Sequence, residues 1–221
     1  WVIDWTSDFV KEFQSAFFNR WKQAKTVYFA RHAQTSLNDG TFLGKYRDPE
    51  VKGSHLPKPL ELDIEAIHCS PTTRSLQTAR ALCPDTPINE DELLSEIDYG
   101  TAEGMTYQEF SEKHPEILNA WSQGEDPRFP GGGENTSCVL ARVKTFMKTL
   151  SLNALSTTLV VSHNVVLRCL IGDSHAIPPQ NWYRLIIPHS VLLEFKLLEG
   201  KYYPNIPRTV LGETFSNLQG A

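Results

Sequence analysis

The order of segments along this chain predicts an α/β fold: a three-layer sandwich with a mostly parallel central sheet and helices on both faces. Two apolar runs rich in β-forming residues, at positions 26–30 and 158–161, have the length and composition of buried parallel strands. Segments with helical periodicity alternate with further strand-like runs, which is typical of this class of fold. With 221 residues, the chain is long enough for one well-packed domain.

The remaining elements follow from apolar periodicity and from residues that cap or break it. Residues 136–150 give the clearest helix, since Asn135 or Thr136 can cap its start and apolar side chains recur along one face. Pro115 interrupts the helical pattern of residues 107–121 and predicts one helix with a break or two short helices. The other expected elements are a loop over 38–62, a strand over 64–70, a helix over 74–82, a turn-rich segment over 93–104, a helix over 165–171 and a strand over 190–197.

Aromatic residues recur every four positions at the start of the chain, at Trp1, Trp5, Phe9, Phe13, Phe17 and Trp21. This spacing predicts an amphipathic helix over residues 1–25, ahead of a domain over residues 26–221. We expect the helix to dock on the domain's own surface. A linker helix, a homodimer contact and an interfacial membrane helix are the alternatives, although the last lacks the usual lysine-rich face. Because the chain starts with Trp rather than Met, we expect a trimmed chain or part of a longer polypeptide.

The composition excludes several classes of function. A composition of 40% hydrophobic and 21% charged residues is typical of a globular protein. Its net charge of -5 argues against a nucleic-acid partner. No apolar run approaches the ~20 residues of a membrane helix, and no signal-peptide pattern opens the chain. The 4 cysteines are scattered, without metal-ligand spacing, as is typical of free thiols in a reducing compartment. We therefore expect a cytoplasmic protein with no membrane partner.

Histidines follow both apolar strands close to where each strand ends. Arg31 and His32 come directly after residues 26–30, and His163 follows residues 158–161 after one intervening residue. Residues just past the carboxyl ends of parallel strands line the ligand site of open α/β sheets. Two histidines at that edge, one beside an arginine, favour phosphoryl chemistry over a core contact.

The sequence around these histidines resembles the histidine phosphatase superfamily, also called phosphoglycerate mutase-like. Arg31-His32-Ala33-Gln34-Thr35, followed by Asn38, is similar to the Arg-His-Gly signature of that superfamily. Further segments match in the family's order: Ser70-Pro71 with Arg74 and Gln77-Thr78-Ala79, Glu96 with Asp98-Tyr99-Gly100, Gly131-Gly132-Gly133-Glu134-Asn135, Ser162-His163 and Pro188-His189-Ser190-Val191. The resemblance implies the family's α/β fold.

The resemblance also implies a site for a phosphate monoester dianion. His32 would attack phosphorus to form a phosphohistidine, with its other ring nitrogen held by a backbone carbonyl near Ala33. The charge on the phosphoryl oxygens would be held by three cationic side chains: Arg31, Arg74 and a protonated His163. The candidate substrate-binding residues are Asn38, which would be a neutral donor, Thr35, Asn164 and Gln34.

Glu96 matches the family's acid position and is expected to protonate the leaving oxygen. Asp98 and Glu103 are the alternative candidates for this acid. However, the sequence around Asp98 is typical of a turn, and that around Glu103 is typical of a residue that anchors a loop. Two positions depart from the family. Ala33 replaces the usual glycine, which is tolerated if its φ is negative. Asn164 stands where a glycine is usual, and we expect it to cap the following helix, with a contact to the leaving group as the alternative.

Together these residues predict a metal-independent phosphomonoesterase that acts on a small phosphorylated metabolite and needs no cofactor. Arginines and histidines would do the electrostatic work that metal ions do in kinases. A cofactor-dependent phosphoglycerate mutase is the nearest alternative, and a non-catalytic phosphoryl-binding domain of a larger protein is the third. Mutases have a longer, arginine-rich insertion after the acid, whereas residues 105–130 offer only Lys113 and Arg128. This segment is more similar to α-ribazole phosphatases and broad-specificity phosphatases of the family.

Overall fold

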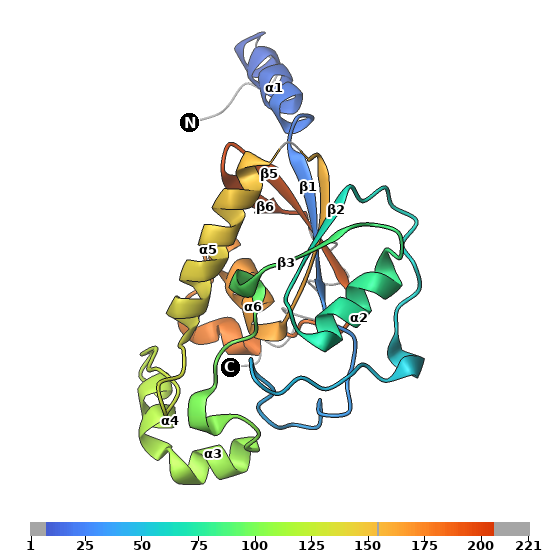
Figure 1. Cartoon of the computed structure of the whole chain (residues 1–221). Helices are drawn as coiled ribbons and strands as arrows, with labels where there is room; N and C mark the ends of the chain where they lie inside the picture. The colour runs from blue at the N-terminus through green and yellow to red at the C-terminus, as the bar shows by residue number, and fades with distance from the viewer. Residues whose placement is uncertain (1–7, 154, 206–221) are drawn as a thin grey trace.

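The computed structural model describes residues 8–153 and 155–205, and these residues form the α/β architecture that the sequence predicts (Figure 1). They build a six-stranded sheet with the strand order β3-β2-β4-β1-β5-β6. The pairs β3–β2, β2–β4 and β4–β1 are parallel, whereas β5 pairs antiparallel with both β1 and β6. The strands are β1 (Lys25–Arg31), β2 (Ala66–Cys69), β3 (Ile88–Glu90), β4 (Thr157–Ser162), β5 (Leu192–Leu198) and β6 (Lys201–Pro204).

The two central strands end at the same level of the sheet. In the parallel pairing of β1 with β4, Arg31 lies opposite Ser162. The backbone N–H of His32 extends this ladder by donating to the carbonyl oxygen of Ser162 at 2.9 Å. The next residue of each strand is therefore a histidine, and His32 and His163 leave the sheet side by side.

Helices cover both faces of the sheet (Figure 1). α5 (Thr136–Leu152) and α6 (Asn164–Ser174) lie on one face, and α2 (Thr73–Leu82) lies on the other. Side chains of β1 alternate between the two resulting cores, as the strand period of two requires. Val27 and Phe29 are buried with residues of α5 and α6, whereas Ala30 is buried with residues of α2.

The helical break at Pro115 is present. It separates α3 (Tyr107–Lys113) from α4 (Pro115–Ser122). A capping box between Thr106 and Glu109 starts α3. Pro115 occupies the first turn of α4, where its missing N–H leaves no helical hydrogen bond unmade. Four short 3₁₀ helices complete the described residues: η1 (Gly53–His55), η2 (Glu92–Leu94), η3 (Gly100–Ala102) and η4 (Pro179–Arg184).

Two strands were not expected from the sequence. β3 has three residues and β6 has four, so neither gives a measurable periodic pattern. β6 pairs with β5 through a tight turn at Glu199 and Gly200, which have φ angles of 52° and 76°. Both strands lie at the edges of the sheet, away from the paired strand ends that carry the histidines.

The N-terminal helix α1 (Asp8–Trp21) extends away from the sheet beyond the start of β1 (Figure 1). At its last turn the helix contacts the domain: Arg20 pairs with Glu199, and the Trp21 ring lies 5.6 Å from that of Tyr203. Phe17 and Phe18 are 48% and 57% exposed. Residues 14–20 are exposed. Within residues 14–21, the expected docking on the domain surface is therefore limited to the last turn of the helix. Residues 1–7 of the expected helix and residues 206–221 of the expected domain lie outside the described residues.

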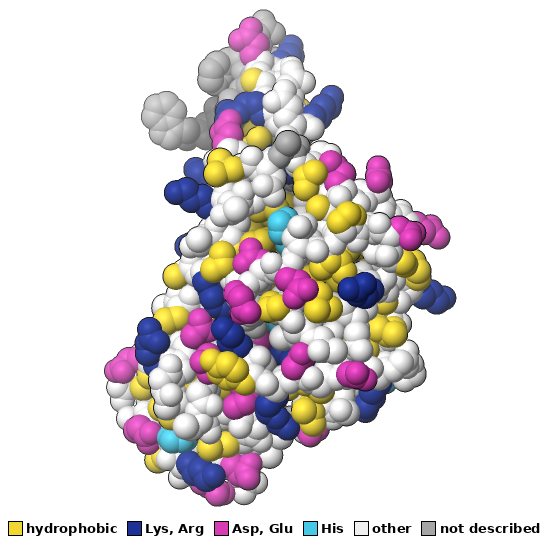
Figure 2. Space-filling view, viewed as in Figure 1, with side chains coloured by type: hydrophobic (Ala, Val, Ile, Leu, Met, Phe, Trp, Pro, Cys, Tyr) yellow, Lys and Arg dark blue, Asp and Glu magenta, His cyan; other side chains and the backbone are white. Residues whose placement is uncertain are grey.

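The surface is mixed in charge, and Figure 2 shows lysine, arginine and acidic side chains interspersed over the viewed face, with no stripe of a single sign. Across residues 8–153 and 155–205, no helix combines the length and the apolar character that crossing a membrane requires.

Candidate active site

The sequence-predicted catalytic residues converge at the carboxyl ends of β1 and β4. The ring centroids of His32 and His163 are 5.2 Å apart, and both side chains are buried. Arg31 comes from the end of β1, and Arg74 comes from the first turn of α2 on the neighbouring strand crossover. Glu96 joins them from the segment before η3. Five ionisable groups thus share one buried site.

The tautomer of His32 is fixed by its own backbone surroundings. Nδ1 of His32 donates to the carbonyl oxygen of Ala33 at 2.8 Å, so Nε2 keeps its lone pair. Burial, followed by the charge of Arg74, lowers the pKa of His32 well below its ordinary value. The ring is therefore neutral near pH 7, as a nucleophile must be. The carbonyl of Ala33 is the one predicted for this contact, and Ala33 itself has no positive φ, so its methyl group causes no backbone strain.

His163 is bonded through both ring nitrogens. Nη2 of Arg74 donates to Nδ1 of His163 at 3.3 Å, since arginine can only donate. Nε2 of His163 therefore carries the proton, and it lies 2.7 Å from Oγ of Ser70. Burial and Arg74 lower the pKa of His163 well below its ordinary value. The protonated form expected from the sequence is thus disfavoured here, and a bound phosphate dianion would shift the pKa back upward.

Within the described part of the chain, each of the two arginines has one buried donor without a partner. Nη1 of Arg31 donates to the carbonyl oxygen of Ile187 at 2.7 Å, while its Nε is buried and unpaired. Nε of Arg74 is also buried and unpaired, although the rest of this guanidinium is bonded. Burial lowers the pKa of Arg31 to about 10, so the side chain stays charged near pH 7. Two unpaired cationic donors beside a neutral imidazole are suited to an anionic ligand.

Arg74 is held by the loop that follows β1. Its Nη1 donates to the carbonyl oxygen of Arg47 at 2.7 Å and its Nη2 to that of Gly44 at 2.8 Å. Oδ1 of Asp48 lies 3.2 Å from Nη1. The same carboxylate accepts from the backbone N–H of Thr73 at 2.7 Å, which ties the loop to the start of α2. This role of Asp48 could not be predicted from the sequence, because the loop has no periodic pattern.

Glu103 fixes that loop from the other side. Its Oε1 accepts from the backbone N–H of Gly44 at 2.8 Å and from that of Arg47 at 3.2 Å. A side chain at position 44 could not fit, because a Cβ there would lie 2.3 Å from Oε2 of Glu103. Glu103 is therefore a loop anchor, as its sequence context indicates.

Glu96 is buried at the start of α6. Its Oε1 accepts from the backbone N–H of Ile97 at 3.0 Å and from that of Val165 at 3.2 Å. Burial raises the pKa of the Glu96 carboxyl. This effect is larger than that of the two N–H donors and of Arg74, which lower the pKa. A raised pKa suits a general acid. Asp98, one of the rival carboxylates, accepts from the backbone N–H of Gly100 at 2.8 Å and behaves as a turn residue.

Two of the predicted substrate-binding residues form one unit. The N–H and the hydroxyl of Thr35 donate to Oδ1 of Asn38 at 2.8 and 2.9 Å, which leaves the Nδ2 group as the donor end of that amide. Gln34 is half-buried next to Thr35, and its carbonyl oxygen accepts from Lys52 at 3.3 Å.

The expected capping role of Asn164 is wrong. His163 is the N-cap residue of α6 and its side chain makes no capping hydrogen bond, while Asn164 is already the first helical residue. From inside the first turn, its side chain cannot reach back to the N–H groups that a cap would satisfy. Oδ1 of Asn164 is instead buried without a partner among the described residues.

His189 is a site residue that the sequence reasoning left without chemistry. Its Nδ1 donates to the carbonyl oxygen of His32 at 2.8 Å, and the two ring centroids are 5.4 Å apart. Burial, followed by the charge of Arg31, lowers the pKa of His189 to about 4. The adjacent Ser190, with a φ of 59°, donates to the carbonyl oxygen of Arg31 at 3.0 Å and brings His189 into the site. The similarity of Pro188-His189-Ser190-Val191 to the family was the signal that could have found it.

A neutral histidine with a fixed tautomer, flanked by two buried arginines and a carboxyl of raised pKa, defines a site for phosphoryl transfer. Comparison with known proteins agrees. Residues 27–203 match the model of the histidine phosphatase superfamily (branch 1), and the chain belongs to that superfamily. This confirms the family that the sequence resembles.

Individual relatives and solved structures agree with this placement. The chain is 29% identical over 179 residues to a 6-phosphofructo-2-kinase/fructose-2,6-bisphosphatase of Caenorhabditis elegans, covering 76% of this chain and 38% of that protein. It is 29% identical over 157 residues to phosphoserine phosphatase 1 of Hydrogenobacter thermophilus, covering 65% of this chain and 73% of that one. The α-ribazole phosphatase of Shigella flexneri has the same fold, with a TM-score of 0.71, 20% identity, and coverage of 82% of this chain and 95% of that one. The chain spans little more than a third of the bifunctional relative's length.

Proposed function

We propose that this protein is a metal-independent phosphomonoesterase that hydrolyses a small phosphate ester through a phosphohistidine on His32. The unpaired Nε donors of Arg31 and Arg74 carry this proposal, because buried cationic donors without partners are costly unless a ligand satisfies them. A phosphate dianion has both the charge and the acceptor oxygens that these donors lack. The lone pair of His32 Nε2 supplies the nucleophile for the same ligand.

The reaction proceeds in two displacements. Nε2 of His32 forms a bond to phosphorus while the bond to the ester oxygen breaks, and protonated Glu96 gives its proton to the departing alkoxide. Water then attacks the phosphohistidine and passes a proton to Glu96, which restores the acid as inorganic phosphate forms. Arg31 and Arg74 offset the charge of the equatorial oxygens in both steps. Asn38, Thr35, Gln34 and Asn164 are the proposed contacts to the ester.

Hydrolysis is favoured over mutase activity by the segment beyond the acid. α3 and α4 lie past the carboxyl edge of the sheet (Figure 1) and carry the acidic Glu109, Glu112 and Glu116 on exposed surface. Arg128 donates to the carbonyl oxygen of Gly133 at 3.3 Å. A mutase needs a second cluster of cations to retain a phosphoglycerate while it reorients, and residues 105–130 do not provide one.

The test is phosphate release from ethyl phosphate and p-nitrophenyl phosphate, with and without EDTA, alongside conversion of 3-phosphoglycerate to 2-phosphoglycerate primed with 2,3-bisphosphoglycerate. We expect phosphate release that EDTA does not reduce, and no isomerisation. Isomerisation with little phosphate release would identify a mutase, and binding of phosphate without either reaction would identify a non-catalytic domain.

We also propose a cytoplasmic setting for the enzyme. All four cysteines, Cys69, Cys83, Cys138 and Cys169, are free thiols, which suits the reducing cytoplasm. The exposed Phe17 and Phe18 make α1 the proposed place for a homodimer contact or for attachment to a longer chain.

A further inference from the structure

A cavity of about 520 Å³ adjoins the catalytic residues and has no part in the chemistry described so far. Its volume is within the usual range for sites of small organic ligands. Its walls carry aromatic side chains from several separate segments of the chain: Phe42, Tyr99, Tyr107, Trp121, Phe129, Trp182 and Tyr183.

The aromatic walls are preformed. The ring of Phe129 lies 4.7 Å from that of Tyr99, 5.7 Å from that of Phe42 and 5.5 Å from that of Trp121. On the opposite wall, Nε1 of Trp182 donates to the carbonyl oxygen of Ile177 at 2.8 Å. Rings that already pack on one another lose little further conformational entropy when a ligand binds.

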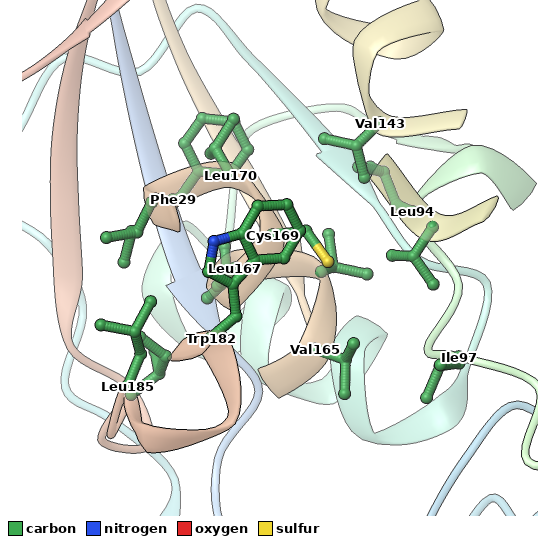
Figure 3. Packing of buried hydrophobic residues seen from close by; sticks show 14 of the residues in the cluster. Phe29, Leu94, Ile97, Val143, Val165, Leu167, Cys169, Leu170, Trp182 and Leu185 are labelled. Carbon is green, nitrogen blue, oxygen red and sulfur yellow. The ribbon is translucent and has the colours of Figure 1, made fainter. Parts of the chain in front are cut away.

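Trp182 packs directly on α6. A Cβ at Gly172 would lie 2.1 Å from Nε1 of Trp182, so only glycine permits this approach. Trp182 belongs to the same buried cluster as Cys169 and Leu167 of that helix (Figure 3). The helix that starts at His163 therefore also forms one wall of the cavity.

Glu96 joins the cavity to the catalytic site. The two residues whose N–H groups donate to Glu96, Ile97 and Val165, both line the cavity. The group proposed to protonate the leaving oxygen is therefore one hydrogen bond from two residues of the cavity wall.

The cavity offers little to a second anionic group. Among its lining residues, all within the described ranges, Arg168 is the single cation, and its Nε already donates to the carbonyl oxygen of Leu185 at 2.6 Å. Asp126 also lines the cavity, and its carboxylate accepts from Thr136 and Ser137 at the start of α5. The lining of this cavity is suited to binding an apolar ring.

We propose that this cavity binds the alcohol part of the substrate, and that the enzyme prefers phosphate monoesters of alcohols with an aromatic ring over small polar esters such as phosphoserine. This inference rests on the proposed phosphomonoesterase function. Aromatic walls bind a flat apolar ring by burial and by offset or edge-to-face contacts.

Two primary alkyl esters of similar leaving-group basicity test the proposal: ethyl phosphate and 3-phenylpropyl phosphate. We expect kcat/KM to be at least about 30-fold higher for the phenylpropyl ester, because its ring leaves water on binding. Equal kcat/KM for both esters would overturn the inference while leaving the phosphatase intact. Release of phosphate from neither ester would contradict the proposed function instead.

Binding without turnover gives a separate measure. Calorimetry with ethylphosphonate and 3-phenylpropylphosphonate, which cannot be hydrolysed, should show the same preference in Kd. Equal Kd values would overturn the inference even if no ester is turned over.

Two exposed tyrosines at the cavity allow a mutational test with little risk to folding. Tyr107 on α3 and Tyr183 on η4 line the cavity and are 61% and 65% exposed. Tyr107→Ala and Tyr183→Ala should each reduce the preference for the phenylpropyl ligands about 3-fold or more, with ethyl phosphate turnover unchanged. Tyr203→Ala, on β6 and outside the cavity, is the control and should change neither. An unchanged preference in both cavity variants would contradict the assignment of the ring to this cavity.

Discussion

Nη2 of Arg74 lies 3.3 Å from Nδ1 of His163, and this contact joins the start of α2 to the end of β4. It determines which nitrogen of His163 carries a proton and places a permanent charge next to the phosphate site. Arg74 has no exposed surface, so its position depends entirely on its protein partners. The geometry of this arginine is the first property to test.

Replacing Arg74 with lysine should nearly abolish activity. Lysine keeps the charge but cannot reproduce the planar set of donors that reaches Gly44, Arg47 and His163 together. We expect kcat/KM for phosphate release to fall by about 100-fold or more, by analogy with the loss of one oxyanion donor. Arg80→Lys, on the exposed side of the same helix, is the matched control. Near-normal activity of Arg74→Lys would show that charge alone is sufficient.

Glu103 is expected to act as a positioning residue through the loop that holds Arg74. Glu103→Ala removes the acceptor for the N–H groups of Gly44 and Arg47, so we expect KM to rise more than kcat falls, and the free energy of unfolding to drop by about 1–3 kcal/mol in urea titrations. Glu103→Gln should restore most of both, because an amide oxygen can accept the same two bonds. Glu50→Ala, exposed in the same loop, is the control. Failure of the glutamine variant to rescue KM would point to a role for the negative charge instead.

The role of Glu96 can be separated by leaving group. Glu96→Gln should slow ethyl phosphate far more than p-nitrophenyl phosphate, whose leaving group barely needs a proton. Because burial raises the pKa of Glu96, the wild type should keep its acid form above the usual carboxyl range. Activity on ethyl phosphate should then decline as pH rises through that pKa. Equal slowing of both esters by Glu96→Gln would transfer the role to Asp98, Glu103 or water.

The buried histidines should make the fold sensitive to acid. Since the pKa of His189 is lowered to about 4, the unfolded chain binds this proton more readily than the folded protein. Stability is then lost as pH falls from the ordinary histidine value towards about 4. His189→Asn should reduce this slope by up to about 1.4 kcal/mol per pH unit, measured by urea unfolding between these two pH values. An unchanged slope in His189→Asn would mean that His189 titrates normally in the folded protein.

The sequence predicted the site residues whose positions are determined by the ends of the central strands. His32 and His163 follow two strands that could be recognised, and parallel pairing brings such ends together. The hydrogen bond from His32 to the Ala33 carbonyl was predictable because it joins neighbouring residues. The edge strands β3 and β6 were too short to recognise, and the antiparallel direction of β5 depends on pairing that local periodicity does not encode.

The parts that escaped prediction depend on contacts between distant segments. Glu103 reaches Gly44 across 59 positions, and His189 reaches His32 across 157. The aromatic cavity combines side chains such as Phe42, Trp121 and Trp182, which share no periodic pattern. Asn164 was misassigned because cap residues and first-turn residues differ by a single position, and sequence boundaries are not that sharp.

The central claim is that His32 becomes phosphorylated at Nε2 during turnover. The most direct measurement is to mix the enzyme with substrate, quench within one turnover into alkaline denaturant, and locate the phosphoryl group by peptide mass spectrometry. Chromatography against the two phosphohistidine isomers then identifies the nitrogen. We predict phosphate on Nε2 of His32, because Nδ1 is bonded to the Ala33 carbonyl. His189→Asn should still be labelled, whereas His32→Ala should be neither labelled nor active. Turnover by His32→Ala, or a phosphoryl group on His163 or His189 in the wild type, would contradict the account.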